Sequence, residues 1–253
     1  MVVLTDTIFY RYETNLADMR TDGNEREIPI KVWYPEGAEA KHHPLLIFSP
    51  GSFGGAESNE TLYLELASRG YVVMGISHPY HSFSSKMSDG RTIRVDWGFL
   101  WSVVTSEGVK NMESNLASLR EWTQVRIDDI NVILDRLLDS QVDNVYESLI
   151  DTERIVLSGH SLGGAAALTV GRDRSEEIRA MVILEAPFSG DIIGIEGDQY
   201  VFTNEEYPLP VLHVYSDSSF TTLDEIATYG MNVRLLESDN PMYVNKHISG
   251  VGH

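Results

Sequence analysis

The chain has 253 residues, of which 42% are hydrophobic and 23% are charged. This composition is typical of an ordinary globular protein and excludes a disordered chain, a collagen and a coiled coil. The 19 Lys and Arg stand against 38 Asp and Glu, so the formal charge is −19, and nucleic acids and anionic membranes are unfavourable partners. Cysteine is absent, which excludes disulfides, thiolate metal sites and a cysteine nucleophile.

The N-terminal segment has no basic region, no uninterrupted apolar core and no small-residue cleavage site, so it does not read as a signal peptide. No run reaches about eighteen consecutive apolar residues, and no integral membrane segment is predicted. A cytoplasmic location is the simplest interpretation. A secreted protein whose signal has been removed is the alternative.

Short apolar runs alternate with helical patterns, and no repeat or Pro-, Gly- or Ser-rich linker interrupts them. The predicted strands cover residues 28–34, 44–48, 71–76, 155–158, 180–184 and 211–215. The predicted helices cover residues 60–69, 120–138 and 162–170. The candidate core positions of the long helix are Val125, Ile127, Ile130, Ile133, Leu134 and Leu137. We predict one α/β domain over residues 1–253, a mostly parallel sheet with helices on both faces and a ligand site at the carboxyl ends of its strands.

Two stretches depart from this alternation, at residues 78–115 and 189–208, and we expect both to form a cap or the walls of a pocket. The first contains a hairpin turn at residues 88–91. Its aromatic cluster at residues 97–101 is expected to pack in the core, with the wall of an apolar pocket as the alternative. His78 and His81 flank a proline that disfavours a helix, so a loop beside the pocket is expected rather than a metal site.

The sequence GHSLGG at residues 159–164 follows a predicted strand and precedes a helix of small residues. It contains Gly-x-Ser-x-Gly in the strand–turn–helix setting that a nucleophilic serine needs. The turn is strained so that the hydroxyl points away from the sheet. Glycine is needed on both sides of the serine because a side chain there would collide with neighbouring backbone. We therefore predict that Ser161 is the nucleophile.

A serine nucleophile of this kind needs two backbone N–H groups that stabilise the oxyanion. Leu162 supplies one, since it follows the serine at the start of a helix. The other is expected from the sequence SPGSFGG at residues 49–55, where Ser52 is the first choice and Phe53 the alternative. These glycines could also form a phosphate-binding loop, but neither nucleotide-binding glycine pattern fits them.

Several segments together carry a resemblance to known proteins: IPIKVWYP at residues 28–35, FSPGSFG at 48–54, LASRGYVV at 66–73, ISH at 76–78 and GHSLGGA at 159–165. They resemble the alpha/beta-hydrolase fold, and most closely the platelet-activating-factor acetylhydrolase-like lipases, with dienelactone hydrolases and cutinase-like polyester hydrolases as cousins. The resemblance runs from residue 26 to residue 253. It implies a serine esterase or lipase that cleaves small or lipid-like esters through an acyl-enzyme, with no cofactor and no metal. The family's second oxyanion donor falls on Ser52, although its usual His-Gly is replaced by Pro50-Gly51 here.

In this fold the triad residues follow in the order serine, acid, histidine. Of the histidines after Ser161, His213 lies inside a predicted strand and His247 suits a strand or a loop. His253 follows the sequence GVG, as in the family's histidine loop. The resemblance therefore implies His253 as general base and acid. Because the family continues with a helix, it also implies a natural chain that extends beyond residue 253.

Two positions compete for the triad acid. Glu185 ends the strand at residues 180–184, where the acetylhydrolase-like group places its acid. Asp217 ends the strand at residues 211–215, where most hydrolases of this fold place theirs, but in the register of the cutinase-like relatives that acid falls on Ser219. We favour Glu185 and keep Asp217 as the alternative.

Other functions of the same fold stay open at this stage. Within enzymes they are a cutinase-like polyester hydrolase, a thioesterase and a peptidase. The alternative from a different class is a non-catalytic ligand-binding protein, because a fold alone does not establish a function. The strongly negative charge favours neutral or cationic esters over anionic ones.

Overall fold

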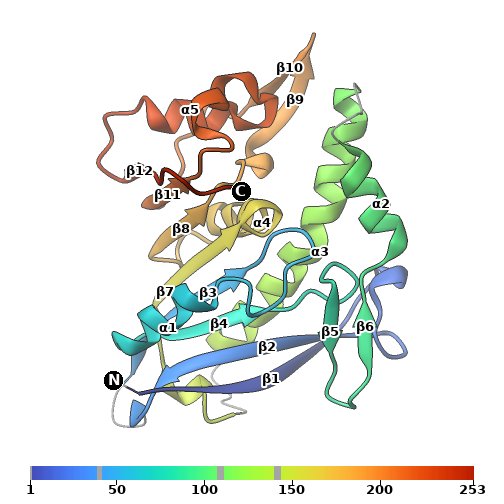
Figure 1. The fold of residues 1–253 in the computed structure, drawn as a ribbon, viewed down its shortest axis with the longest axis vertical. Helices are drawn as coiled ribbons and strands as arrows, with labels where there is room; N and C mark the ends of the chain where they lie inside the picture. Colours follow the sequence, from blue (N-terminus) through green and yellow to red (C-terminus); the bar gives the residue numbers. More distant parts are fainter. Residues whose placement is uncertain (1, 39–41, 107–110, 140–143) are drawn as a thin grey trace.

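The computed structural model describes residues 2–38, 42–106, 111–139 and 144–253. Eight strands form its central sheet: β1 (Val3–Glu13), β2 (Glu25–Pro35), β3 (His43–Ser49), β4 (Val72–Ile76), β7 (Ile150–His160), β8 (Ala180–Leu184), β11 (Val211–Tyr215) and β12 (Tyr243–His247). Their order is β1-β2-β4-β3-β7-β8-β11-β12 (Figure 1). β2 pairs antiparallel with both of its neighbours, and the pairings from β4 to β12 are all parallel. The predicted, mostly parallel sheet is therefore confirmed.

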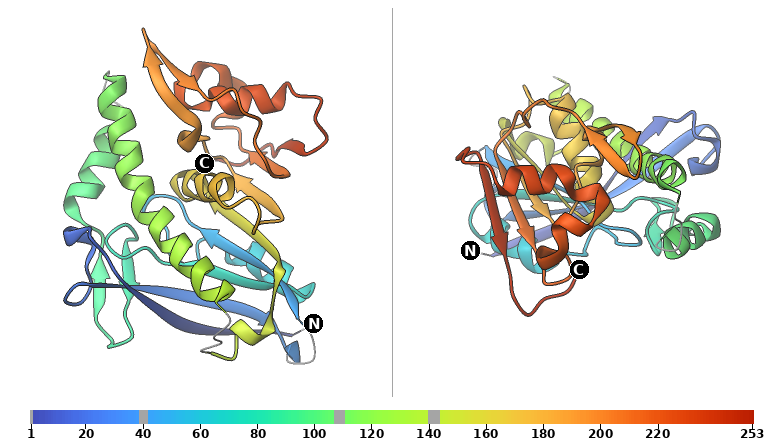
Figure 2. Two further views of the ribbon diagram at one scale, coloured as in Figure 1. Left: turned by 180° about the vertical axis from the view of Figure 1, so that it is seen from behind. Right: turned by 90° about the horizontal axis from the view of Figure 1, so that it is seen from above.

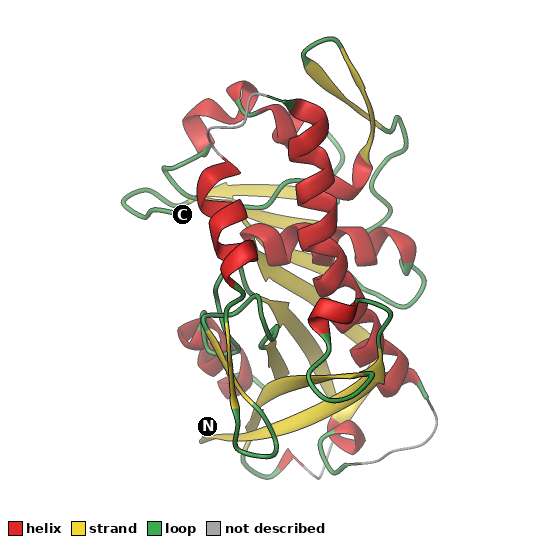
Figure 3. Cartoon of the chain, turned by 90° about the vertical axis from the view of Figure 1, so that its right-hand side faces the viewer, coloured by secondary structure: helices red, strands yellow, loops and turns green. Residues whose placement is uncertain are grey.

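Helices cover both faces of this sheet. The main ones are α1 (Glu60–Ser68), α2 (Trp97–Ser106), α3 (Met112–Leu138), α4 (Ser161–Asp173) and α5 (Gly230–Leu236). α3 runs diagonally across one face and packs on α4 (Figure 2, left), whereas α1 lies on the other face against β2 and β4. Figure 3 views the molecule from the side that α2 and α3 cover.

Each of the two stretches that depart from the alternation contains a small hairpin. β5 (Ser84–Lys86) pairs with β6 (Thr92–Arg94), which confirms the turn predicted at residues 88–91. β9 (Ile192–Glu196) pairs with β10 (Gln199–Phe202) in the second stretch and projects beyond the sheet (Figure 1). Residues 107–110 of the first stretch lie outside the described part of the chain.

Side chains of the central strands alternate between two hydrophobic clusters, one on each face. In β3, Leu45 and Ile47 belong to the larger cluster, which includes residues of α3 and α4. Leu46 and Phe48 belong to the smaller cluster beneath α1. Successive strand residues point to opposite faces, so a strand that is buried on both faces is apolar throughout. This explains the continuous apolar run in the sequence of β3.

The long helix α3 starts before its predicted beginning at residue 120. Asn111 caps its first turn by accepting a hydrogen bond of 3.0 Å from the Ser114 N–H. This cap lies upstream of the apolar periodicity on which the prediction rested. The predicted core positions are buried except Ile127, which is partly buried.

The aromatic cluster of α2 does not pack in the core as a whole. Phe99 is buried and stacks on His81 with ring centroids 3.8 Å apart. Trp97 and Trp101 are 79% and 69% exposed. The expectation of core packing was therefore wrong for the two tryptophans, because α2 buries the side that carries Phe99 and leaves their side open to solvent.

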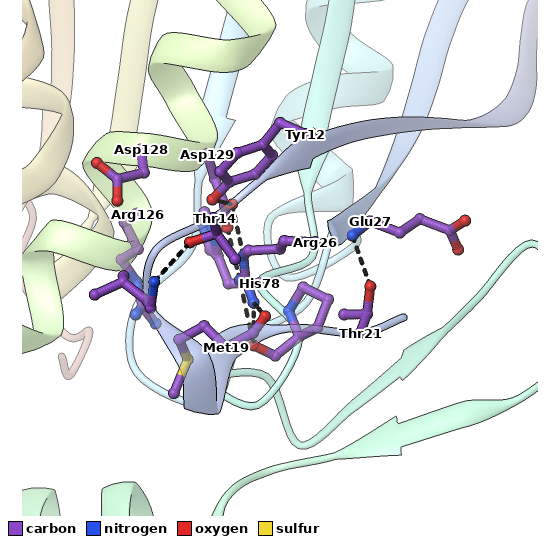
Figure 4. Close-up of polar contacts among 12 residues, drawn as sticks. Tyr12, Thr14, Met19, Thr21, Arg26, Glu27, His78, Arg126, Asp128 and Asp129 are labelled. Carbon is purple, nitrogen blue, oxygen red and sulfur yellow. Dashed lines mark hydrogen bonds and ion pairs between the residues drawn. The ribbon is translucent and has the colours of Figure 1, made fainter. Parts of the chain in front are cut away.

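Asp129 of α3 is fully buried and is the centre of a polar cluster (Figure 4). Its carboxylate accepts two hydrogen bonds of 2.8 Å from Arg26 of β2, one of 2.9 Å from the Tyr12 hydroxyl and one of 2.8 Å from His78 Nδ1. Burial alone would raise the pKa of Asp129, but the charge and hydrogen bonds of Arg26, and then those of His78, lower it below its ordinary value. The cluster thus ties α3 to β1, to β2 and to the segment after β4.

We predict that Asp129→Asn lowers the free energy of unfolding by about 3–5 kcal/mol, because it leaves the buried Arg26 charge without a counter-charge. The folded-state pKa of Asp129 lies below its unfolded value. Its contribution is therefore complete above about pH 4 and is lost as the pH falls through the folded-state pKa. Urea denaturation at several pH values measures both effects.

Asp151→Asn is the matched control for this measurement. Asp151 pairs with Arg154 at 2.6 Å, but both side chains are partly exposed. Exposed ion pairs add little to stability, so this variant is expected to unfold at nearly the native urea concentration. Equal losses in the two variants would contradict the importance given to the Asp129 cluster.

Candidate active site

Ser161 lies at the junction of β7 and α4 in a conformation that side chains avoid, with a φ of 50°. The junction leaves no room for further side chains. A Cβ on Gly159 would lie 2.7 Å from backbone atoms of Gly163, and a Cβ on Gly163 would overlap the carbonyl oxygen of Ser49. The close approach of backbone segments therefore requires glycine at both positions and presents the Ser161 hydroxyl beyond the end of the sheet.

His253 connects the hydroxyl of Ser161 to a carboxylate. Its Nε2 lies 2.9 Å from Ser161 Oγ, and its Nδ1 lies 3.5 Å from Oε2 of Glu185. Glu185 follows β8, and its own φ is 44°. Figure 1 places the C-terminus beside α4, in agreement with these contacts. Three side chains from distant parts of the sequence thus form a continuous series of carboxylate, imidazole and hydroxyl.

The carboxylate of Glu185 is buried and hydrogen-bonded. Its Oε2 accepts a hydrogen bond of 3.2 Å from the Ser216 N–H. Burial alone would raise the pKa of Glu185, but the hydrogen bonds of Ser216 and the charge of His253 outweigh burial, and the pKa is lowered. The side chain is therefore ionised at neutral pH and can stabilise a positive charge on the ring of His253.

Asp217 holds the loop that precedes His253 and does not contact the His253 ring. One of its oxygens lies 2.7 Å from His247 Nε2, and the other accepts a hydrogen bond of 2.7 Å from the Gly250 N–H. The hydrogen bonds from Gly250 and then from His247 lower the pKa of Asp217. The His253 N–H donates to Ser218 Oγ at 2.9 Å. The loop after β11 thus positions the backbone of the final residues.

Leu162 and Ser52, the two predicted oxyanion donors, follow Ser161 and Gly51, which lie close to each other. Leu162 is in the first turn of α4, whose N–H groups have no partner within the helix. Gly51 lies against Ser161, since a Cβ on Gly51 would be 3.2 Å from the Ser161 Cβ. The loop that continues with Ser52 therefore starts beside Ser161.

The N–H of Phe53 already has an acceptor. It donates to the carbonyl oxygen of His81 at 3.0 Å, and the backbone of Phe53 has a φ of 69°. Within the described residues, the N–H of Ser52 has no hydrogen-bond acceptor. Of the two residues predicted for the second oxyanion donor, Ser52 is thus the one whose N–H is available.

A second series of carboxylate, imidazole and hydroxyl occurs in the buried Asp129 cluster. His78 Nδ1 contacts Asp129, and His78 Nε2 lies 2.9 Å from Oγ of Ser49. Burial lowers the pKa of His78 to about 4, so its ring is neutral at pH 7. Ser49 is 0% exposed, and a substrate cannot reach it. Solvent access therefore distinguishes Ser161 from Ser49.

Of the two histidines predicted to lie in a loop beside the pocket, only one lines a cavity. His81 lines a cavity of about 640 Å³ between α2, α3 and residues 15–19, whereas His78 is enclosed in the Asp129 cluster. Within the described part of the chain, no group of three or more His, Asp or Glu is arranged to hold a metal ion.

A larger cavity of about 990 Å³ is lined on one side by residues 52–58. β1, β2 and the β5–β6 hairpin form its other walls, and its lining includes neither Ser161 nor His253. Phe9, Phe53 and Phe83 contribute rings to the lining, and Lys31 and Lys86 contribute cations. This volume is large enough for an organic ligand.

No family model matches the chain. Two curated relatives are platelet-activating factor acetylhydrolases. The protein from Gallus gallus is 28% identical over 156 residues, which are 54% of this chain and 36% of the relative. The protein from Bos taurus is 23% identical over 202 residues, which are 72% of this chain and 45% of the relative. The chain thus matches less than half the length of either relative, and the resemblance seen in the sequence is confirmed.

Two solved structures have a similar fold. A ferulic acid esterase from Streptomyces cinnamoneus has a TM-score of 0.63 at 18% identity, and the match covers 98% of this chain and 72% of the esterase chain. A dienelactone hydrolase from Anabaena variabilis has a TM-score of 0.52 at 14% identity and covers 98% of this chain and 88% of its own. The predicted alpha/beta-hydrolase fold is confirmed. No helix in the described residues is long and apolar enough to cross a membrane.

We predict that Gly163→Ala lowers the free energy of unfolding by about 2–4 kcal/mol, because its Cβ collides with rigid backbone at Ser49. Gly194→Ala in β9 is the matched control, since a Cβ there has no atom within 4 Å. Thermal and urea denaturation compare the two variants. A Gly163→Ala protein as stable as Gly194→Ala would show that the junction relaxes easily.

Proposed function

We propose that this chain is a serine hydrolase of carboxylic esters that works through an acyl-enzyme. The observation that carries the proposal is the contact of Ser161 Oγ with His253 Nε2 at 2.9 Å, with Glu185 beside Nδ1 of the same ring. A nucleophile, a base and an acid that orients the base are the minimum set for this chemistry. The two curated relatives, named as acetylhydrolases, support the same reaction class.

The reaction follows from these positions. Ser161 Oγ attacks the ester carbonyl while His253 Nε2 takes its proton, and Glu185 stabilises the resulting imidazolium. The N–H groups of Ser52 and Leu162 donate to the oxyanion. Collapse of the tetrahedral intermediate breaks the ester bond, and His253 returns the proton to the departing alcohol. A water molecule then attacks the acyl-enzyme while His253 takes its proton. The carboxylic acid product leaves as His253 returns the proton to Ser161.

The proposed substrate is a neutral or cationic ester with a small or lipid-like acyl group. The formal charge of −19 disfavours strongly anionic substrates. We assign the stretches at residues 78–115 and 189–208 to the walls of the substrate site. They carry the β5–β6 hairpin with α2 and the β9–β10 hairpin, respectively.

A fluorophosphonate probe tests the proposed nucleophile. The native protein is expected to be labelled at one serine, and Ser161→Ala is expected to lose all labelling and ester hydrolysis. Ser49→Ala is the matched control, because Ser49 has the same type of histidine contact but is enclosed. It should still be labelled. A folded native chain that takes up no probe would favour a non-catalytic ligand-binding protein instead.

Amide substitutions distinguish between the two candidates for the triad acid. Glu185→Gln is expected to lower kcat about 10³- to 10⁴-fold, because the ring of His253 loses the charge that orients and stabilises it. Asp217→Asn should lower kcat less than about 10-fold, since an amide oxygen can still accept from Gly250. Steady-state hydrolysis of p-nitrophenyl acetate measures both. The reverse ranking would move the acid to Asp217.

A further inference from the structure

Arg126 of α3 is a fully buried cation that lacks a direct carboxylate partner. It is 0% exposed, and in the described residues no carboxylate lies within ion-pair distance of it. Its Nη1 lies 2.5 Å from His81 Nδ1, its Nη2 donates to the Gly51 carbonyl oxygen at 3.4 Å, and its Nε has no partner. Figure 4 shows Arg126 on α3 close to Asp129, whose carboxylate is used by Arg26.

A buried charge of this kind is costly unless it has a role. Burial lowers the pKa of Arg126 to about 9, which reflects the energy needed to hold the guanidinium away from water. Replacing a buried ionic group by an apolar side chain of similar volume is often neutral or stabilising. Stability alone therefore gives no reason for Arg126 at this position, and incompletely compensated buried charges are concentrated at functional sites.

The contact with Gly51 links Arg126 to the proposed oxyanion hole. The carbonyl of Gly51 and the N–H of Ser52 belong to the same peptide unit. No cis peptide bond occurs in the described residues, and in a planar trans unit the C=O and N–H point in opposite directions. The Gly51 carbonyl accepts from the Gly54 N–H at 3.1 Å and from Arg126 Nη2 at 3.4 Å. Donors on the carbonyl side keep the Ser52 N–H on the opposite side and polarise it, and Arg126 is the charged one of the two. Gly51 lies against Ser161, so this peptide unit borders the nucleophile.

His81, the hydrogen-bond partner of Arg126, holds Phe53 in the same loop. A guanidinium has no acceptor, so His81 Nδ1 must be unprotonated and accept from Arg126. The backbone carbonyl of His81 accepts the Phe53 N–H at 3.0 Å. The stacking of its ring on Phe99 at 3.8 Å fixes the ring plane. Arg126 and His81 therefore support two consecutive peptide units of the loop from beneath.

We propose that Arg126 is a positioning residue of the oxyanion hole, which holds the Gly51–Ser52 peptide unit so that the Ser52 N–H points at the developing oxyanion. This proposal rests on the proposed function. The positive charge also lies on the side of the peptide where it strengthens the dipole as negative charge develops. Its effect is therefore larger in the transition state than in the substrate complex.

The test compares catalysis and oxyanion binding in variants of the full chain. Arg126→Met has a similar length and no charge. It is expected to lower kcat for p-nitrophenyl acetate about 10- to 100-fold, with KM changed less than about 3-fold. The inhibition constant of a trifluoromethyl ketone, which forms a tetrahedral oxyanion on the serine, should rise by the same factor. A merely structural role would not make these two losses equal.

Arg174→Met is the matched control. Arg174 follows α4 and also donates to a backbone carbonyl, that of Asn131 of α3 at 3.3 Å, but it contacts neither the loop at residues 49–55 nor the stretches assigned to the walls of the substrate site. We expect native kcat and native inhibitor affinity. Arg126→Lys keeps the charge but cannot reach His81 and Gly51 together, so it is expected to lose about 3- to 10-fold in both measurements.

The outcomes separate this proposal from the proposed function. A folded Arg126→Met protein with native kcat and native inhibitor affinity overturns the role of Arg126 and leaves the esterase assignment in place. If Arg126→Met does not fold, Arg126→Lys decides in the same way, and native values in it overturn the role. A native chain that neither hydrolyses esters nor takes up the fluorophosphonate probe overturns the proposed function, and with it this proposal.

Discussion

The buried ion pair between Arg26 and Asp129 is the interaction on which the geometry of the site depends. It fixes α3 against β2 from within the core, where no water can replace either partner. His78 adds the segment after β4 and, through Ser49, the end of β3 to the same cluster. Because Asp129 is thus held, the preceding turn of α3 places Arg126 beneath the oxyanion loop. One carboxylate therefore positions elements that are far apart in the sequence.

Two side chains of the candidate site, Ser161 and Glu185, lie where the backbone leaves its regular elements in a strained conformation. Ser161 follows β7 with a φ of 50°, and Glu185 follows β8 with a φ of 44°. A left-handed conformation costs a non-glycine residue about 1–2 kcal/mol. The packed sheet and helices on either side offset this cost, and the same tight turns direct both side chains to the carboxyl edge of the sheet. Neighbouring parallel strands thus bring the two groups together.

The sequence predicted the parts of the fold that depend on local pattern. Apolar runs predicted six strands of the central sheet, and the motif around Ser161 predicted the nucleophile junction. β1 and β12 were not predicted, because they lie at the two ends of the sheet order and are buried less completely. Their sequences mix polar and apolar residues, so they lack the continuous apolar run that marks an inner strand.

The sequence predicts residues for the candidate site but not the contacts that hold them in place. The Gly-x-Ser-x-Gly motif predicts Ser161, and the resemblance of the sequence GVG to the family's histidine loop predicts His253. The role of Asp217 depends on contacts with His247 and Gly250 that no spacing encodes. Arg126 did leave a signal: it falls three residues before Asp129 on the face of α3 that also carries Ile130 and Ile133. A charged pair on an apolar helix face indicates a buried polar cluster, and only the fold shows what the cluster contacts.

The net charge and the field at the nucleophile have opposite signs. The chain carries a formal charge of −19, which attracts cationic substrates and repels anionic ones over the distance that salt screening allows. Two groups near the hydroxyl of Ser161 carry positive charge or partial charge. The N-terminus of α4 presents its N–H groups, and the buried guanidinium of Arg126 lies behind the Gly51 carbonyl. Because Arg126 is shielded from solvent, salt weakens its effect little. An increase in ionic strength should therefore affect the binding of a charged substrate more than the chemical step.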